Sequence, residues 1–379
     1  MLKNICVCLF LLLLSFSGIA SNTKISSIGF NDLPEPISNN AIAHVKLDNQ
    51  DFLLSFMGLA KNKSFKDVHD RAFLMDVSKN QWTQINSVPS SISPKGRLAS
   101  VAIGIGSRAY IFGGYTVDAE HNEISSPDNF AFDLSSRTYQ KIATMPVPVD
   151  DAVALSYQQR YIYIISGWHN DGNVNLVQVY DIKSDSWQQA TPFPGAPVFG
   201  HAGAIVDKTM LICDGVKLTW EGESRRQFDA QAACYEGRID KSNINKITWR
   251  KISHPTNRAR YRMASIGLVK EQKMVFVGGS HNPYNYNGIG YNNEPSHPSK
   301  EIWIYDNQTK SWQTALANVA TMDHRGALLL SSTDSAFENK RPLVITIGGM
   351  GHNQEVLPTV NIIDINKLVE GKPKYLLEK

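Results

Sequence analysis

The sequence predicts an all-β fold in which one structural unit is repeated six times. Apolar residues alternate in short runs bounded by turn residues, as at residues 161–165 and 274–277, which is typical of strands. No long segment carries the apolar stripe of a helix. A glycine that closes a strand then recurs along the chain, at positions 58, 114, 167, 215, 279 and 349.

The first twenty residues differ from the rest of the chain. Lys3 is followed by an apolar run over residues 5–14 and by small residues that end at Ala20. This order is typical of a secretory signal peptide. A membrane anchor is the alternative, but the run is short for a span of about 20 residues. We therefore expect a signal peptide at residues 1–20 and a periplasmic or secreted mature chain, residues 21–379, without further membrane contact.

The composition is that of an ordinary globular protein, with 42% hydrophobic and 19% charged residues and a net charge of +3. Such a small basic excess disfavours a nucleic-acid partner. The mature chain would keep two cysteines, Cys213 and Cys234, and an oxidising compartment permits one disulfide between them. Two cysteines without CxxC spacing make a poor zinc site, so we expect no metal and no cofactor.

Each repeated unit has the same internal order. After the glycine, a further strand ends in a carboxylate and is usually followed by a tryptophan, as in Asp181 with Trp187 and Asp306 with Trp312. This order resembles the kelch repeat, in which each repeat forms one four-stranded antiparallel blade of a β-propeller. The resemblance covers nearly the whole mature chain and implies a six-bladed kelch-type propeller.

Closure of the ring requires a strand from one end of the chain. A propeller leaves no sheet edge unpaired where the first and last blades meet. Residues 28–36 resemble the outer strand of a blade, and residues 374–377 could fill the same place. Either segment would complete the sixth sheet.

The long loops are expected on one face of the propeller. The connections that leave the second strand of each unit are long, whereas most connections between first and second strands are tight turns. Long loops on a rigid scaffold are the usual place for a binding site. Their aromatic, amide and charged side chains suit a sugar. The candidates in these loops are Trp168, Glu221, Glu223, Arg226 and Tyr286.

A second set of candidates precedes the first strand of each unit and is expected nearer the axis. It comprises Asn40, Arg97, Asp151, His201, Arg262 and Arg325. Each arginine alone could form a salt bridge between blades. Three arginines around one mouth would form an anion funnel, so we expect Arg97, Arg262 and Arg325 to bind a carboxylate or phosphate of the ligand.

Among exported six-bladed kelch propellers, the chain resembles the periplasmic N-acetylneuraminate epimerases, which are sialic acid mutarotases. In that family a glutamate follows the glycine of the fourth blade's second strand, and an arginine stands a few residues on. Here Val216 follows Gly215, so the matching position lacks the glutamate. Glu221 or Glu223 would then serve as the base, and the next candidates are His201 and Asp151.

The resemblance implies an isomerase that interconverts the anomers of N-acetylneuraminate or a related acidic sugar. Such an enzyme needs a base for the anomeric hydroxyl and a donor for the ring oxygen. The substrate would contact Arg97, Arg226, Arg262, Arg325, Trp168 and Tyr286.

Two alternatives remain open. The first is a non-catalytic kelch module that binds carbohydrate or protein. The second, more remote, is a copper enzyme like galactose oxidase, which needs a cysteine linked to a tyrosine. Cys213 and Cys234 are expected on adjoining strands of one blade, where a disulfide is the simpler arrangement.

Overall fold

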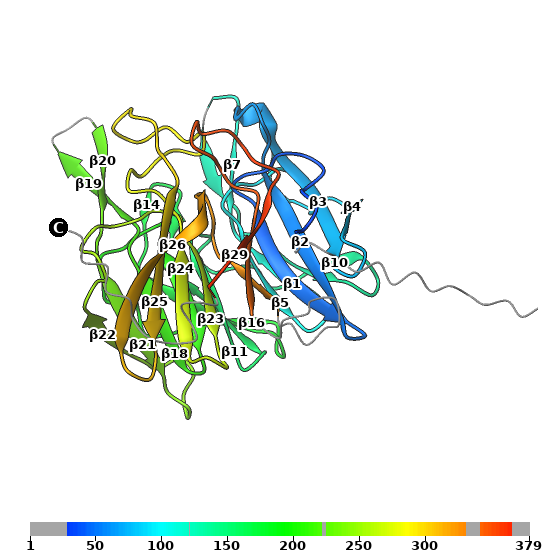
Figure 1. The fold of residues 1–379 in the computed structure, drawn as a ribbon. Coiled ribbons are helices and arrows are strands. Elements are labelled where there is room, and N and C mark those ends of the chain that lie inside the picture. Colours follow the sequence, from blue (N-terminus) through cyan, green and yellow to red (C-terminus); the bar gives the residue numbers. More distant parts are fainter. Residues whose placement is uncertain (1–28, 121, 222–224, 331–341, 366–379) are drawn as a thin grey trace, which may run out of the picture.

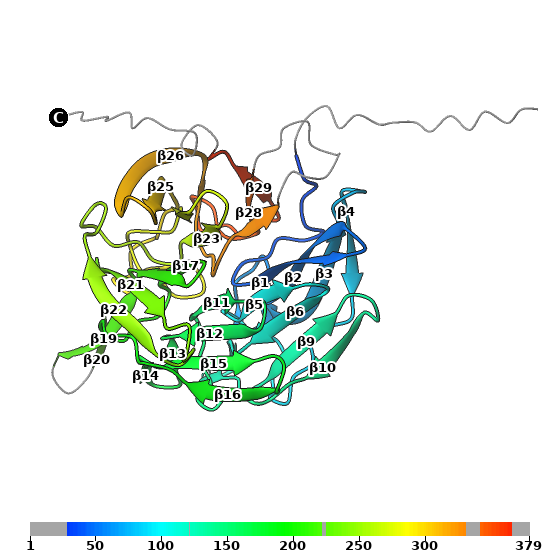
Figure 2. The ribbon, with the colours of Figure 1, turned by 90° about the horizontal axis from the view of Figure 1, so that it is seen from below.

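The computed structural model describes residues 29–120, 122–221, 225–330 and 342–365. It is an all-β propeller whose blades follow one another around a central axis (Figures 1 and 2). The expected signal peptide at residues 1–20 and the candidate closing strand at residues 374–377 lie outside the described residues. Within the described ranges, no helix has the length and apolarity needed to cross a membrane.

The strands pair in sequence order within each blade, and all pairs are antiparallel. Blade 1 consists of β1 (Ala41–Leu47), β2 (Gln50–Leu59), β3 (Val68–Asp76) and β4 (Gln81–Ile85). Blade 2 consists of β5 (Val101–Ile105), β6 (Arg108–Phe112), β9 (Asn129–Asp133) and β10 (Thr138–Lys141). Blade 3 consists of β11 (Val153–Tyr157), β12 (Tyr161–Ile165), β15 (Val177–Asp181) and β16 (Ser186–Gln189).

The second half of the ring follows the same order. Blade 4 consists of β17 (Ala202–Val206), β18 (Thr209–Cys213), β21 (Cys234–Ile239) and β22 (Ile247–Ile252). Blade 5 consists of β23 (Ala264–Leu268), β24 (Lys273–Val277), β25 (Ser299–Asp306) and β26 (Ser311–Thr321). The described part of blade 6 contains β27 (Leu328–Leu330), β28 (Leu343–Ile347) and β29 (Val360–Ile363).

Three of the long loops fold into two-stranded hairpins beyond the blades. These are β7 (Tyr115–Val117) with β8 (Glu123–Ser125), β13 (Trp168–His169) with β14 (Gly172–Asn173), and β19 (Val216–Glu221) with β20 (Arg225–Ala230). They lie on the face at the top of Figure 1, which we call the upper face. The loops are thus ordered elements that can hold side chains in fixed positions.

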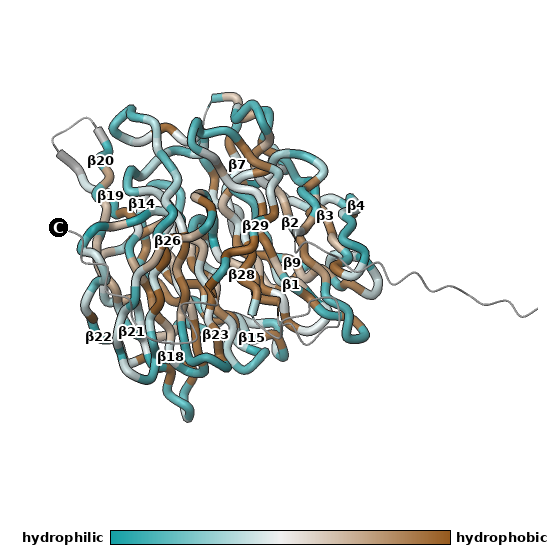
Figure 3. The backbone as a smooth tube through the Cα atoms, in the orientation of Figure 1, coloured by the Kyte–Doolittle hydropathy of each residue, from teal (hydrophilic) through white to brown (hydrophobic). Residues whose placement is uncertain are grey.

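The core lies between neighbouring blades, where apolar strand residues gather (Figure 3). The repeated tryptophan is part of this packing. Trp187 of blade 3 lies with its ring 5.6 Å from that of Phe112 in blade 2, and its Nε1–H donates to the carbonyl of Ala143 at 2.9 Å. A buried tryptophan contributes a large apolar area and also satisfies its polar N–H, so the repeat couples each blade to the preceding one.

The paired glycines close the second strand where two blades touch. Gly113 and Gly114 adopt φ angles of 57° and 86°, a region that glycine enters without steric cost. A Cβ on Gly113 would stand 2.0 Å from the carbonyl oxygen of Val149 in the next blade. The first glycine of this pair is therefore required both by its backbone angle and by the contact between blades.

Residues 29–38 run between blades 6 and 1. The N–H of Leu33 donates to the carbonyl of Pro358 at 2.8 Å, and the N–H of Ile37 donates to that of Leu357 at 3.2 Å. Both side chains are buried with residues of blades 1 and 6. Of the two candidates for the closing strand, this segment hydrogen-bonds to the loop before β29 and forms no strand in the described part of blade 6, and the other candidate lies outside the described residues.

Candidate functional site

Six equivalent residues surround the axis just below the upper loops. They are Asn39, Ala99, Asp151, Gly200, Arg262 and Asp323, and all have φ between 48° and 72°. Backbone hydrogen bonds link neighbours in this inner ring, for example from the N–H of Asp151 to the carbonyl of Ala99 at 3.0 Å.

The sequence placed Asp151 and Arg262 correctly in the inner ring. The residues expected there in the other four blades were Asn40, Arg97, His201 and Arg325, and each lies one or two residues from the position that forms the ring. The reason is that each blade reaches the ring through one residue of left-handed backbone, and its position relative to the apolar strand varies.

Two arginines and two aspartates form a buried ion-pair cluster on the axis. Arg262 Nε lies 2.9 Å from Asp151 Oδ2, and Arg325 Nε lies 2.8 Å from Asp151 Oδ1. Asp323 Oδ1 accepts from both arginines at 3.1 and 3.0 Å. All four side chains are at most 4% exposed. Their charges cancel, so the expected anion funnel of unpaired arginines is not what the described residues form.

The cluster also lowers the pKa of the Asp151 carboxyl. Burial alone would raise the pKa of this carboxyl, but the positive charges of Arg262 and Arg325 outweigh burial and hold the pKa below its ordinary value. A carboxylate that binds two arginines is a weak base. Asp151 is therefore unsuited to the catalytic role considered for it.

Arg97 lies inside blade 2, away from the axis. Its Nη1 donates to the carbonyls of Gly113 at 2.9 Å and Asp128 at 3.0 Å. Its side chain is completely buried, and burial lowers its pKa to about 10, against the opposing charge of Asp128. Arg260 makes the same contacts in blade 5, to Gly278 and Glu301. Arg97 was expected to bind the ligand, and the structure instead commits its guanidinium to the strands of its own blade.

Replacing Arg97 by methionine should lower the free energy of unfolding by about 1–3 kcal/mol, because the buried carbonyls of Gly113 and Asp128 each lose a hydrogen bond from the guanidinium, although Gly113 keeps that from the Ser100 hydroxyl. Urea denaturation would measure the change. The matched control is Arg108→Met, since Arg108 is half-exposed and pairs with Asp133 at the surface. An Arg97→Met protein as stable as this control would contradict the structural role.

His201 is also buried away from the upper loops. Its Nε2 lies 2.9 Å from the carbonyl of Ile165 in blade 3 and therefore donates to it. Burial lowers its pKa to about 4, although the Ile165 carbonyl and Asp151 oppose the shift. His201 was a candidate for the base, and the structure instead places its ring against the neighbouring blade and outside the residues that line the upper pocket.

A pocket of about 520 Å³ opens on the upper face. Its aromatic wall comprises Tyr115, Trp168, Phe199, Phe228, Tyr286 and Tyr291. Its polar lining comprises Glu123, Asp150, Asp151, Arg226, Arg262, Asn285 and Asn293. The structure thus brings together five residues predicted from the sequence: Asp151, Trp168, Arg226, Arg262 and Tyr286. Glu223 and the side chain of Glu221 lie outside the described residues.

The aromatic wall is fixed by packing among its own rings. Phe228 and Tyr291 stack with centroids 4.1 Å apart and an interplanar angle of 25°. Trp168 meets Phe199 edge-on at 5.4 Å. Rings held in this way present a rigid apolar surface to a ligand.

Two carboxyl groups of the pocket were missed by sequence reasoning. Glu123 and Ser125 alternate along β8 and so face the same side. The hydroxyl of Ser125 donates to Asp150 Oδ2 at 2.9 Å. The adjacent carboxyls of Asp150 and Asp151, just before a first strand, could have indicated Asp150. Glu123 stands in a polar loop without any recognisable motif.

The surroundings of these carboxyls raise the pKa of both groups. Burial raises the pKa of Glu123, and the charges of Arg262 and Arg226 only partly oppose it. Burial, reinforced by the charge of Asp151, raises the pKa of Asp150 well above its ordinary value despite the Ser125 hydrogen bond. A carboxyl whose pKa is raised is a stronger proton acceptor, when ionised, than an ordinary one.

Arg226 is the accessible cation at the rim of the pocket. Its guanidinium lies 5.6 Å from the centroid of the Trp168 ring. Its partner, Asp171, is 2.7 Å away but 88% exposed. An ion pair so open to water is weak, so an anionic ligand can compete for Arg226.

A second cavity, of about 410 Å³, follows the axis below the cluster and is lined by the innermost strands of all six blades. Arg325 and Asn40 line this cavity and not the upper pocket. Arg325 was expected at the ligand carboxylate. The structure instead commits its guanidinium to Asp151, Asp323 and Asn39.

The two cysteines of the described chain form a disulfide. Cys213 on β18 and Cys234 on β21 are directly opposed, with an S–S distance of 2.01 Å. Neither is available for the tyrosine link that a copper enzyme of the galactose-oxidase type would need.

Comparison with known proteins agrees with this architecture. The family model described as the KLHDC2/KLHL20/DRC7 Kelch-repeats domain matches residues 43–234. The solved "Structure of YjhT" aligns with a TM-score of 0.64 at 12% identity, over 89% of this chain and 97% of that one. At this identity the likeness shows the fold alone.

Of two curated relatives, one is named only for its kelch domain and the other for an enzymatic activity. Kelch domain-containing protein 3 of Bos taurus is 24% identical over 238 residues, which are 57% of this chain and 56% of that protein. N-acetylneuraminate epimerase of Salmonella arizonae is 23% identical over 238 residues, or 52% of this chain and 57% of that protein. The chain spans about half the length of the curated relatives it matches.

Proposed function

This chain belongs to the family of the KLHDC2/KLHL20/DRC7 Kelch-repeats domain, and we propose that its upper pocket binds an acidic sugar and exchanges the anomers of that sugar. The observation that carries the proposal is the combination of Glu123, Asp150 and an aromatic wall in one pocket of about 520 Å³. This volume is within the range of small-molecule sites. The similarity to an N-acetylneuraminate epimerase makes that sugar the first substrate to test.

Binding would use the two sides of the pocket differently. The apolar C–H faces of a sugar ring would lie against Trp168, Phe228 and Tyr286, which line the wall. Asn285 and Asn293 would exchange hydrogen bonds with hydroxyls. Arg226 would pair with the sugar carboxylate, since charged hydrogen bonds are the stronger ones.

In the proposed reaction, Glu123 as carboxylate takes the proton of the anomeric hydroxyl, while protonated Asp150 donates a proton to the ring oxygen. The C–O bond of the ring opens to give the carbonyl form. After rotation of the carbonyl carbon, the ring hydroxyl attacks its other face. The two proton transfers then run in reverse, so both carboxyls regain their starting states. Paired general acid and base groups typically contribute factors of about 10²–10⁴ each.

We further propose that the protein acts in the periplasm or outside the cell. The order of residues in the first twenty positions is typical of a signal peptide. A disulfide such as Cys213–Cys234 persists in oxidising compartments.

The decisive test is NMR of freshly dissolved N-acetylneuraminate in its crystalline anomeric form, with and without the protein. We expect the approach to anomeric equilibrium to be faster with the protein, in proportion to its concentration. Neutral N-acetylmannosamine serves as the comparison sugar. If the protein binds the sugar but does not speed anomer exchange, it is a non-catalytic binding module. The name of the relative Kelch domain-containing protein 3 states no enzymatic activity and is compatible with that result. If the protein neither binds any acidic sugar nor speeds the exchange of its anomers, the proposal is overturned.

A further inference from the structure

A second hollow, of about 410 Å³, adjoins the upper pocket, and we call it the side hollow. The two share Phe228 and Tyr291 in their linings, and the rings of these residues stack with centroids 4.1 Å apart. The rest of the side hollow is lined by Asp229, Ala230, Gln231, Asn282, Pro283 and Asn292. A ligand that extends from the upper pocket past the stacked rings therefore enters the side hollow.

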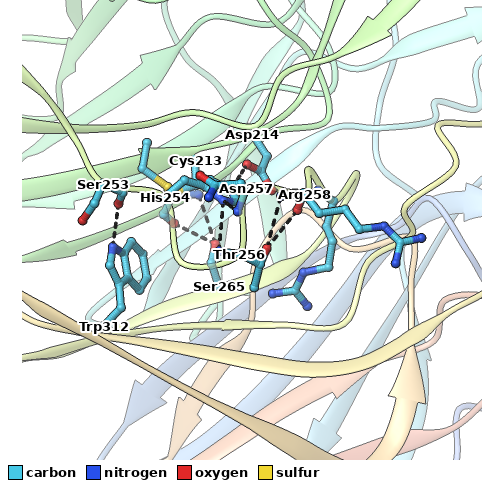
Figure 4. Close-up of a disulfide and its surroundings, with 12 residues drawn as sticks. Cys213, Asp214, Ser253, His254, Thr256, Asn257, Arg258, Ser265 and Trp312 are labelled. Atoms are coloured by element: carbon cyan, nitrogen blue, oxygen red, sulfur yellow. Dashed lines mark hydrogen bonds and ion pairs between the residues drawn. A yellow bond between two sulfur atoms is a disulfide. The ribbon is translucent and has the colours of Figure 1, made fainter. Parts of the chain in front are cut away.

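One part of the side hollow is anchored to blade 4. Asp229 and Ala230 pair with β19 at the end of β20, and the N–H of Gln231 donates to the carbonyl of Gly215 at 2.9 Å. Shortly afterwards the chain enters β21 at Cys234, which the disulfide to Cys213 fixes to β18 (Figure 4). This part of the lining thus belongs to backbone that the blade holds in place.

The other part of the side hollow carries two amides in fixed orientations. Nδ2 of Asn282 donates to Oδ1 of Asn292 at 3.1 Å and to the carbonyl of Glu294 at 3.0 Å. The N–H of Glu294 donates to the same Asn292 oxygen at 3.1 Å. These bonds use Nδ2 of Asn282 and Oδ1 of Asn292, so Oδ1 of Asn282 as acceptor and Nδ2 of Asn292 as donor are the groups that can bind a ligand.

This lining suits an uncharged sugar. The rings of Tyr291 and Pro283 match the apolar C–H faces of a hexose, and the amides match its hydroxyls. Of the described residues that line the side hollow, only Asp229 is charged, whereas the upper pocket contains Arg226 and Arg262. A second carboxylate would be repelled by Asp229, so the two hollows differ in the charge that they favour.

We propose that the ligand of the upper face is an acidic sugar that carries a neutral sugar on one of its hydroxyls other than the anomeric one. This inference rests on the proposed function. The acidic unit occupies the upper pocket with its anomeric hydroxyl free, because anomer exchange opens the ring at that carbon. The neutral unit occupies the side hollow against Tyr291. The bond between the two sugars is neither formed nor broken.

The test compares N-acetylneuraminate with its galactosyl derivatives by isothermal titration calorimetry with the full chain. The derivatives carry one galactosyl group on O4, O7, O8 or O9, which together are all the hydroxyls apart from the anomeric one. A matched set carries galacturonosyl, which adds a carboxylate to the same ring. We expect one galactosyl isomer to bind at least about tenfold more tightly than N-acetylneuraminate, since each added hydrogen bond contributes a factor of about 2–10. Its galacturonosyl counterpart should lose this gain.

Two tryptophan variants show where the second sugar binds. Ala230→Trp fills the side hollow and should abolish the gain of the galactosyl isomer, while the affinity for N-acetylneuraminate stays unchanged. Ala232→Trp is the matched control, since Ala232 is exposed and lines neither hollow. If Ala230→Trp does not fold, Gln231→Ala removes one amide of the side hollow instead. This change should weaken binding of the galactosyl isomer alone, by about 2–10-fold.

The outcomes separate this inference from the proposed catalysis. If no galactosyl isomer binds more tightly than N-acetylneuraminate, the inference is overturned, and faster anomer exchange of N-acetylneuraminate would still support the proposed function. A gain that persists in Ala230→Trp also overturns the inference. A gain that is lost in Ala230→Trp and kept in Ala232→Trp supports it, even if the protein speeds no anomer exchange and the proposed catalysis fails. If neither the monosaccharide nor any derivative binds, both are overturned.

Discussion

Asp151→Asn is expected to lower the free energy of unfolding by about 3–5 kcal/mol, the typical cost of breaking a buried ion pair by removing one partner. Asp151 accepts hydrogen bonds from Arg262, Arg325 and the hydroxyl of Tyr261. Asparagine keeps the shape of the side chain but leaves the two buried arginines with only one carboxylate. Urea unfolding followed by tryptophan fluorescence would measure the loss.

The effect should depend on pH in a defined direction. Because the pKa of Asp151 is held below its ordinary value, its contribution is fully present above about pH 4 and disappears as the pH falls through the lowered pKa. The difference between wild type and variant should therefore narrow in acid.

The matched control is Asp133→Asn. Asp133 lies 3.0 Å from Arg108, whose side chain is 47% exposed, so this change should cost less than about 1 kcal/mol. An Asp151→Asn protein no less stable than Asp133→Asn would show that the cluster does not hold the blades together.

Glu123→Gln is expected to slow anomer exchange by about 10²–10⁴-fold while sugar binding is largely kept, because glutamine retains the size of the side chain but cannot take a proton. The rate of wild type should fall as the pH drops through the raised pKa of Glu123. This decline should come at a higher pH than the ordinary value of about 4.3 for glutamate. NMR exchange rates and ligand titration would be measured together.

Glu120→Gln is the control, since Glu120 is exposed on the same loop and does not line the pocket. If Glu123→Gln loses binding and rate to the same extent, Glu123 positions the sugar and another group takes the proton. If Glu123→Gln exchanges anomers at the wild-type rate, Glu123 is not the base, even though the wild-type test of the proposed function still stands.

The fold was predictable from the sequence because its causes are local and repeated. A glycine at 114 or 279 marks a positive φ at the end of a strand, and Trp187 or Trp312 marks contact with the preceding blade. Strand alternation then predicts which side chains are buried. Six copies of a weak pattern support one another in a way that a single copy does not.

The site was only partly predictable because its geometry depends on contacts between distant segments. The arginines were identified as charged residues near first strands, but they have partners far away in the sequence, 61 positions for Arg262 with Asp323 and 174 for Arg325 with Asp151. Arg97 and Arg262 look alike in sequence, yet one lies inside a blade and the other on the axis. The position of Glu123 depends on the β7–β8 hairpin, which the sequence pattern did not predict.

Several positions of the inner ring are linked to their neighbours without the use of their side chains. The links from Asn39 through Ala99, Asp151 and Gly200 to Arg262 run through backbone N–H and carbonyl groups, so alanine, glycine, arginine, asparagine and aspartate all occupy equivalent positions. The link between Asp323 and Asn39 instead uses the Asp323 carboxylate, which accepts from the Asn39 N–H. Substitution at Ala99 would change the chemistry at the centre of the molecule while the main-chain links stay intact, whereas a Cβ on Gly200 would stand 1.9 Å from a ring carbon of Tyr261. A position linked through its main chain can acquire a new specificity without loss of the link, because recognition at the axis and contact with the next blade are there carried by different atoms.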